Sequence, residues 1–358
     1  MQTSPSAERE GIPVLNRRRR HLTLFALATV VATGTSCSSG SQPDVEVCGS
    51  VHTGFEVSKE VVLNTPIRRA LAIDSELRKA YVPYKKRDDS GGVLMIDIDQ
   101  FAITDDVPFP DGVGALALDA KSHLVYVADS RDSIAVLDGD TGERVRSLTI
   151  QDGVGLLALD GQHDVLYAAS WTNDGLRAVN PETGDVITTI DIPFRPTKIA
   201  VDEANRLVYA AATGGEDGGR VVTIDGSQNS VIASSEVKGS DGGLAVDTAN
   251  HRVFVSSSYY GVVSVIDAAT GEVTDTFADF HTPHSMALCG DALFVANRDP
   301  GDIVVADAFT GDIAHTLSVG THPAAMAVDG ATGNVWVLSA GDTARTTPGL
   351  LSVITPKA

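Results

Sequence analysis

Three histidines have the spacing of a candidate metal site. His281 and His284 are separated by two residues, and His322 lies one sequence repeat later. Imidazole nitrogens are ligands of zinc and copper, so three of them on adjacent loops could hold one ion. The alternative is that all three are ordinary loop residues. The sequence therefore gives zinc or copper binding as a hypothesis.

Other residue types favour binding over catalysis. Four basic residues precede apolar runs and could attract an anionic ligand: Arg68, Arg69, Arg195 and Lys198. Three aromatic residues in polar segments are candidate contact residues for a protein or small-molecule ligand, since aromatics are enriched at interfaces: Trp171, Tyr259 and Tyr260. No GxSxG, HExxH or Walker-type motif occurs, and no nucleophile–base pair can be assigned. We expect no catalytic residues and, more generally, no enzyme.

The elements that must position these residues repeat along the chain. In each copy an apolar run is followed, usually seven residues after its end, by an aromatic residue. The runs end at Asp74, Asp119, Asp160, Asp202, Asp247, Cys289 and Asp329, which lie 40 to 45 residues apart. The aromatics are Tyr81, Tyr126, Tyr167, Tyr209, Phe254, Phe294 and Trp336. Such self-similarity indicates a repeat architecture, with these seven aromatics in the core.

Each repeat contains four short strand patterns. A third apolar run, such as residues 263–267, is followed by a tight turn, as in Thr270-Gly271-Glu272, and then by an alternating run. Glycine in the turn supplies the positive φ that a bulged hairpin needs. Four antiparallel strands per period are the pattern of a propeller blade. We therefore predict an all-β, seven-bladed β-propeller over residues 55–358.

The last repeat supplies only three strands before the chain ends. The missing fourth strand matches residues 55–63, which lead directly into the first repeat. Pairing this N-terminal strand with residues 350–354 would complete the last blade and remove an exposed edge. The sequence predicts that the ring closes in this way.

The three cysteines suggest two different roles. First strands run away from the channel mouth, so Cys289 ends on the opposite face of the sixth blade, where the N-terminal strand of the neighbouring blade begins. Cys48 precedes that strand by a distance that an extended chain can bridge. We predict a Cys48–Cys289 disulfide; the alternative is a buried hydrophobe at Cys289 and a free thiol at Cys48.

The N-terminus resembles an export signal. A run of arginines at positions 17–20 precedes an apolar stretch and then the small residues before Cys37, which resembles a bacterial lipobox, although Gly34 replaces the usual large aliphatic residue. We expect a signal peptide at 1–36, lipidation of Cys37 and a linker at 37–54; an ordinary cleaved signal peptide is the alternative. The expected location is the outer face of the cytoplasmic membrane, in the cell envelope.

The charge of the chain limits its partners. Lys and Arg total 27 against 47 Asp and Glu, a net charge of −20. So acidic a surface argues against nucleic acid as a partner and leaves a lipid chain as the expected link to the membrane.

The segment from Val253 to Glu272 resembles the YVTN-repeat family of bacterial surface and periplasmic propellers. The resemblance extends over residues 55–358 and implies a WD40-like repeat fold whose activity varies between members. It implies a binding or scaffold protein, with a periplasmic metallochaperone or a lactonase-like hydrolase as alternatives.

Overall fold

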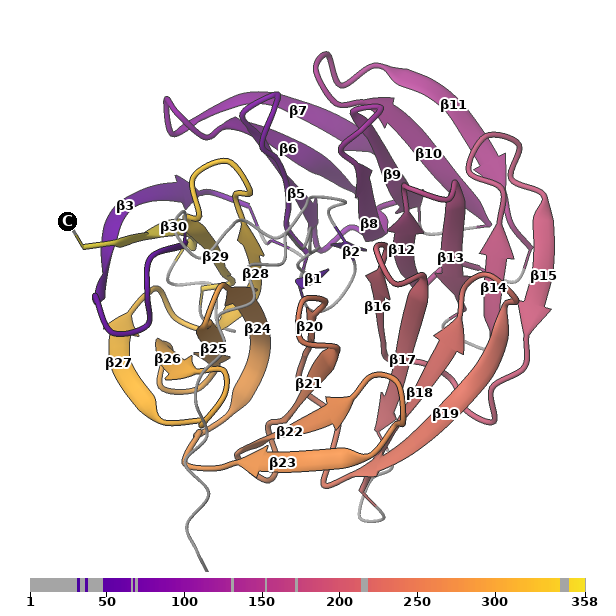
Figure 1. The fold of residues 1–358 in the computed structure, drawn as a ribbon. Coiled ribbons are helices and arrows are strands. Elements are labelled where there is room, and N and C mark those ends of the chain that lie inside the picture. Colours follow the sequence, from indigo (N-terminus) through magenta and orange to yellow (C-terminus); the bar gives the residue numbers. More distant parts are fainter. Residues whose placement is uncertain are drawn as a thin grey trace, which may run out of the picture.

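The computed structural model describes residues 31–32, 36–37, 48–65, 67, 70–129, 132–151, 153–170, 173–213, 218–341 and 348–357. Within these residues the regular elements are β-strands, apart from a helical assignment at Cys48, and no helix is long and apolar enough to cross a bilayer. Seven sheets of four strands stand in a ring around a central axis (Figure 1). The predicted seven-bladed β-propeller is confirmed.

Strands of equal rank occupy equal places in the blades, which we number one to seven along the chain. The first, innermost strands are β4 (Ala72–Asp74), β8 (Val113–Asp119), β12 (Leu156–Asp160), β16 (Lys198–Asp202), β20 (Leu244–Asp247), β24 (Pro283–Cys289) and β28 (Pro323–Val328). The second strands are β5 (Lys79–Lys85), β9 (Leu124–Asp129), β13 (Val165–Ala169), β17 (Leu207–Thr213), β21 (Arg252–Ser257), β25 (Ala292–Asn297) and β29 (Val335–Ser339).

The remaining strands form the outer half of each blade. The third strands are β6 (Gly91–Asp97), β10 (Ser133–Asp138), β14 (Leu176–Val179), β18 (Gly219–Asp225), β22 (Val262–Asp267), β26 (Asp302–Asp307) and β30 (Gly349–Pro356). The fourth strands are β7 (Ala102–Phe109), β11 (Arg144–Thr149), β15 (Val186–Ile190), β19 (Ser230–Val237), β23 (Val273–Phe277), β27 (Ile313–Ser318) and β3 (Phe55–Leu63). Two short strands, β1 (Val31–Ala32) and β2 (Ser36–Cys37), pair with each other near the centre of the ring (Figure 1).

Burial explains the strand sequences. First strands are sandwiched between neighbouring blades and are buried along almost their whole length, as in β12. Fourth strands face solvent and are mostly exposed, as in β15. The seven repeated aromatics are all at most 2% exposed, which places them in the core between blades.

One irregularity recurs in every blade. The pairing of third and fourth strands shifts by one residue near the start of the fourth strand, for example between Ala178↔Thr188 and Val179↔Val186. A shift of this kind is a β-bulge, which leaves one residue unpaired and bends the strand. Blade seven has the same shift between Val57 and Lys59 of β3.

The N-terminal strand closes the ring as predicted. β3 pairs antiparallel with β30 from Phe55↔Pro356 to Leu63↔Gly349. Across the junction with blade one, Phe101 stacks on Trp336 with ring centroids 5.3 Å apart, and the Lys59 ammonium lies 4.2 Å from the centre of the Phe101 ring. The first and last parts of the chain are therefore joined by both backbone pairing and side-chain packing.

Candidate functional site

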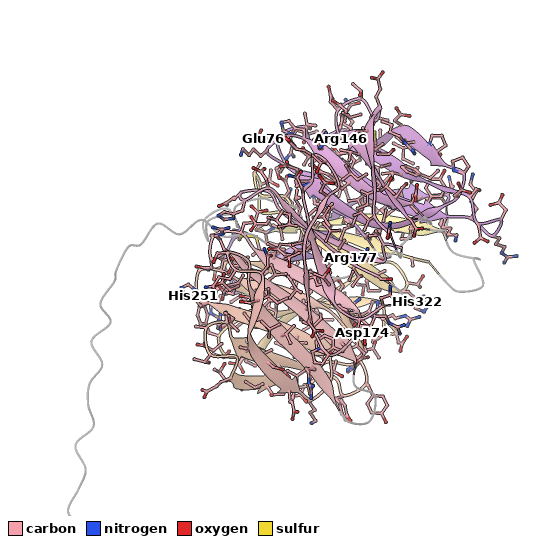
Figure 2. All side chains as sticks on the ribbon, turned by 90° about the vertical axis from the view of Figure 1, so that its right-hand side faces the viewer. Glu76, Arg146, Asp174, Arg177, His251 and His322 are labelled. Carbon is pink, nitrogen blue, oxygen red and sulfur yellow. A yellow bond between two sulfur atoms is a disulfide. The ribbon has the colours of Figure 1, made fainter. Side chains whose placement is uncertain are left out.

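The two ends of the blades carry different loops. First strands begin and second strands end on one side of the ring, which we call the mouth face, and the turns between them form the opposite face. Figure 2 shows Asp174 and His322 on the mouth side and Glu76 and His251 on the other side. The loops before first strands and after second strands therefore share one face, where the sequence predicts contact residues.

An exposed pair of tyrosines marks the mouth face of blade five. Tyr259 is 80% exposed and Tyr260 is 37% exposed, and their rings meet edge to face with centroids 4.9 Å apart. The Lys238 ammonium lies 5.7 Å from the centre of the Tyr260 ring. This group combines rigid aromatic area with one positive charge, which suits contact with a protein surface.

The loop that carries the tyrosines is fixed by its own hydrogen bonds. Gly261 adopts φ 64°, and a Cβ there would lie 2.3 Å from the Phe280 carbonyl oxygen, so no other residue fits. Ser257 Oγ donates to Asp241 Oδ1 at 2.8 Å and accepts from the Tyr260 amide at 3.3 Å. The tyrosines are thus presented by an ordered loop, which lowers the entropy lost on binding.

The other predicted ligand-face residues are more scattered. Arg195 is exposed on the loop that leads into blade four, and Lys198 is the first residue of β16 in the same blade. Arg68, Arg69 and Trp171 lie outside the described residues. Cys37 belongs to β2, and its lipidation remains a prediction.

The three histidines of the predicted metal site lie in different local surroundings. Among the described residues, no group of three His, Cys, Asp or Glu side chains could hold a metal ion. His284 is the bulged residue of β24 and is only 7% exposed, whereas His281 is exposed on the preceding loop. His322 Nδ1 instead lies 2.9 Å from the Gly341 carbonyl oxygen. His284 is thus buried within a strand and His322 contacts its own loop, and binding of zinc or copper by these histidines stays a prediction.

Cys48 and Cys289 are joined by a disulfide, with their Cα atoms 5.3 Å apart and both residues fully buried. The segment after Cys48 is held further by blade six. The Val51 amide donates to Asp291 Oδ1 at 2.9 Å, and His315 Nε2 lies 2.9 Å from the Val51 carbonyl oxygen. The approach to β3 is therefore attached to the ring before the strand itself begins.

Ionisable side chains gather on the opposite face, where sequence reasoning missed them. In blades one and two, a basic residue four positions after the aspartate anchor of the blade reaches the aspartate anchor of the preceding blade. Arg78 Nη1 lies 2.7 Å from Asp329 Oδ2, and His123 Nδ1 lies 2.7 Å from Asp74 Oδ2. The hydrogen bond with Asp74 raises the pKa of His123. The equal spacing of Arg78 from Asp74 and of His123 from Asp119 was the available sequence signal.

Glu203 is the most perturbed carboxyl of this face. It is 3% exposed and accepts a hydrogen bond from the Gly161 amide of blade three at 3.1 Å. Burial, together with the nearby Asp160 carboxylate, raises the pKa of Glu203 to about 7. Burial also raises the pKa of Asp160. This contact joins blades three and four and has no link to the mouth face.

Comparison with known proteins adds a family. The sequence model of the family described as outer membrane protein assembly factor BamB matches residues 111–317, from the start of blade two to the end of blade six. No curated protein matches the chain. Among solved structures, hydrazine synthase from Kuenenia stuttgartiensis is similar, with a TM-score of 0.65 and 13% identity over 78% of this chain and 94% of that chain. At this identity the likeness concerns the fold alone.

Proposed function

Because the chain belongs to the family of outer membrane protein assembly factor BamB, we propose that it is a binding or scaffold module of the cell envelope, which holds a protein partner at the mouth of its channel. Within that family, the Val-Ser-Val-Ile-Asp run at 263–267 followed by Thr270-Gly271-Glu272 supports the finer assignment to YVTN-type repeats.

The exposed Tyr259–Tyr260 pair carries this proposal. A tyrosine that is 80% exposed leaves apolar surface in water, and its burial under a partner would be favourable. The loop bonds at Ser257 and the cation–π contact of Lys238 hold the pair ready for contact. The acidic chain as a whole favours partners with basic or neutral surfaces.

Lipidation of Cys37 would place this module on the membrane. The change Cys37→Ala should move the protein from the detergent phase to the aqueous phase, because the acyl chains that anchor a lipoprotein would be absent. Phase partitioning followed by mass spectrometry of the N-terminal peptide checks this. A wild-type protein that is wholly soluble without detergent would rule out the anchor.

Site-directed photo-crosslinking tests the mouth as the binding face. A photoreactive residue at position 259 in native membranes should give a discrete adduct, and the same residue at position 76, on the opposite face, should not. Adding Tyr260→Ala should weaken the adduct at position 259 by about tenfold, as for loss of a hot-spot aromatic. Equal crosslinking from both faces, or none from position 259, would contradict the proposal.

A further inference from the structure

Every blade ends in a fourth strand with a free outer edge. Such an edge can pair with another chain, and proteins usually protect it with charged side chains or proline. The structure describes all seven fourth strands, and six of them contain at least one ionisable residue. The protecting residues include Glu56, Lys59 and Glu60 of β3, Asp105 and Asp106 of β7, Arg144 and Arg146 of β11, Glu236 of β19, Asp275 of β23 and His315 of β27.

The fourth strand of blade three lacks this protection. β15 reads Val-Ile-Thr-Thr-Ile, with no ionisable residue and no proline. These β-branched residues favour extended backbone, so the edge is ready to accept a strand. Val186 is 47% exposed and Ile187 is 52% exposed. Ile187 is the bulged residue of the strand, which is why two neighbouring aliphatic side chains are both exposed.

Nothing in the described part of the chain continues this sheet. Its strand order is β12-β13-β14-β15, so β15 has a hydrogen-bonded neighbour on its inner side only. Figure 1 shows β15 at the outer margin of the ring. The backbone groups on its outer side are therefore available to an added strand.

The residues that flank β15 indicate the charge of the occupant. Asp185 and Asp191 stand immediately before and after the strand, and both are exposed. A second copy of this chain, paired about a two-fold axis at Thr188, would bring Asp185 opposite Asp191 of the other copy. Like charges directly opposite each other destabilise a strand pair. Basic residues at the ends of a partner strand would instead be attracted.

We propose that the edge of β15 is a strand-addition site for an extended segment of a partner protein, about five residues long, uncharged in its middle and basic at both ends. The site lies on the outer margin of blade three and does not involve the tyrosines of blade five. Its existence is therefore independent of the function proposed for the mouth.

A synthetic peptide of alternating valine and threonine with one arginine at each end is the probe. Fluorescence anisotropy should show binding to the wild type. Ile187→Lys should weaken binding about tenfold, because it places a charge on the uncharged edge. Ile232→Lys is the matched control: Ile232 is the bulged residue of β19, is 51% exposed, and should leave binding unchanged. Equal melting temperatures of the two variants would show that both are folded.

Two further measurements distinguish peptide that pairs with the edge of β15 from peptide that binds elsewhere on the protein. Bound peptide should slow amide hydrogen exchange within Val186–Ile190, and a peptide with aspartate at each end should bind about tenfold more weakly. Three results would overturn the proposal: no binding of the arginine-ended peptide, equal losses from both lysine variants, or a concentration-dependent dimer that Ile187→Lys abolishes.

Discussion

At the scale of single residues, the repeated aromatic of one blade is matched to the turn of the next. The Tyr81 hydroxyl donates to the Gly139 carbonyl oxygen at 2.9 Å, and a Cβ at Gly139 would lie 2.6 Å from that hydroxyl oxygen. Where the corresponding turn residue is Ala308, the preceding aromatic is Phe254, which has no hydroxyl, and both pack in the same cluster. A tyrosine hydroxyl thus occupies the space beside a glycine, and a phenylalanine, which lacks the hydroxyl, leaves room for the alanine methyl group.

Tyr209 differs from Tyr81, because it packs with Ala268 and its buried hydroxyl has no hydrogen-bond partner among the described residues. An unpaired buried hydroxyl costs about 1–3 kcal/mol. We therefore expect Tyr209→Phe to raise the free energy of unfolding by about 1 kcal/mol, whereas Tyr81→Phe should lower it by a similar amount. Denaturant unfolding of the two variants measures both values. A loss of stability in Tyr209→Phe would mean that the hydroxyl has a partner.

Glu203 should make stability depend on pH. Its folded-state pKa of about 7 lies above the usual 4.5, so the folded protein binds a proton that the unfolded chain releases between these values. This contribution to stability is present at low pH and is lost as the pH rises through 7. The free energy of unfolding of Glu203→Gln, compared with that of wild type, should rise by about 3 kcal/mol between pH 4.5 and pH 8, because glutamine does not titrate. The glutamine amide oxygen can still accept the hydrogen bond from the Gly161 amide. Unfolding curves at several pH values test this, and a constant difference would contradict it.

At the scale of elements, what the sequence predicts depends on periodicity. The anchors from Asp74 to Asp329 repeat in every blade, and so the blade count and the closing strand follow from the sequence. His284 shows the limit, because its place in a bulge of β24 results from pairing with β25, which the spacing of histidines does not encode. The edge of β15 could not be identified from its own sequence for a similar reason. Its lack of charged residues stands out only when the fourth strands of all seven blades are compared.

Removal of the closing strand β3 should lower the stability of the ring. Val61 and Leu63 of β3 are buried against blade one, and burial of one aliphatic side chain contributes about 1.5–3 kcal/mol. A chain that begins at Ile67 should therefore unfold at a lower temperature and over a broader range. A chain that begins at Cys48 retains β3 and should keep the cooperative transition of the full protein. Calorimetry compares them, and equal midpoints would mean that β3 does not close the ring.

At the scale of the whole molecule, the ring is closed by charge as well as by strands. Arg78 of blade one also contacts Asp99 at 2.8 Å, so the guanidinium links its own blade to Asp329 of blade seven, whose side chain is fully buried. These two carboxylates hold the pKa of Arg78 above its usual value despite partial burial. Arg78 therefore adds ion pairs to the strand pairing and ring packing that join the first and last blades.

Loss of that cation should destabilise the ring. Arg78→Ala leaves the buried Asp329 carboxylate without its counter-ion, and the expected cost is about 3 kcal/mol. The matched control is Arg220→Ala, which removes an exposed pair with Glu236 and should cost less than about 0.5 kcal/mol. Chemical denaturation measures both, and similar small effects would show that strand pairing alone closes the ring.

The position of the disulfide has a mechanical consequence. Cys48 lies seven residues before Phe55, so a force that pulls the N-terminal segment is transmitted through the sulfur atoms to Cys289 in blade six. The ladder between β3 and β30 is then out of the line of load. With the disulfide reduced, the same pull acts on Phe55 and can unzip the ladder one pair at a time, beginning at Phe55↔Pro356. An oxidised propeller can therefore be held under tension by its N-terminus while its ring stays closed.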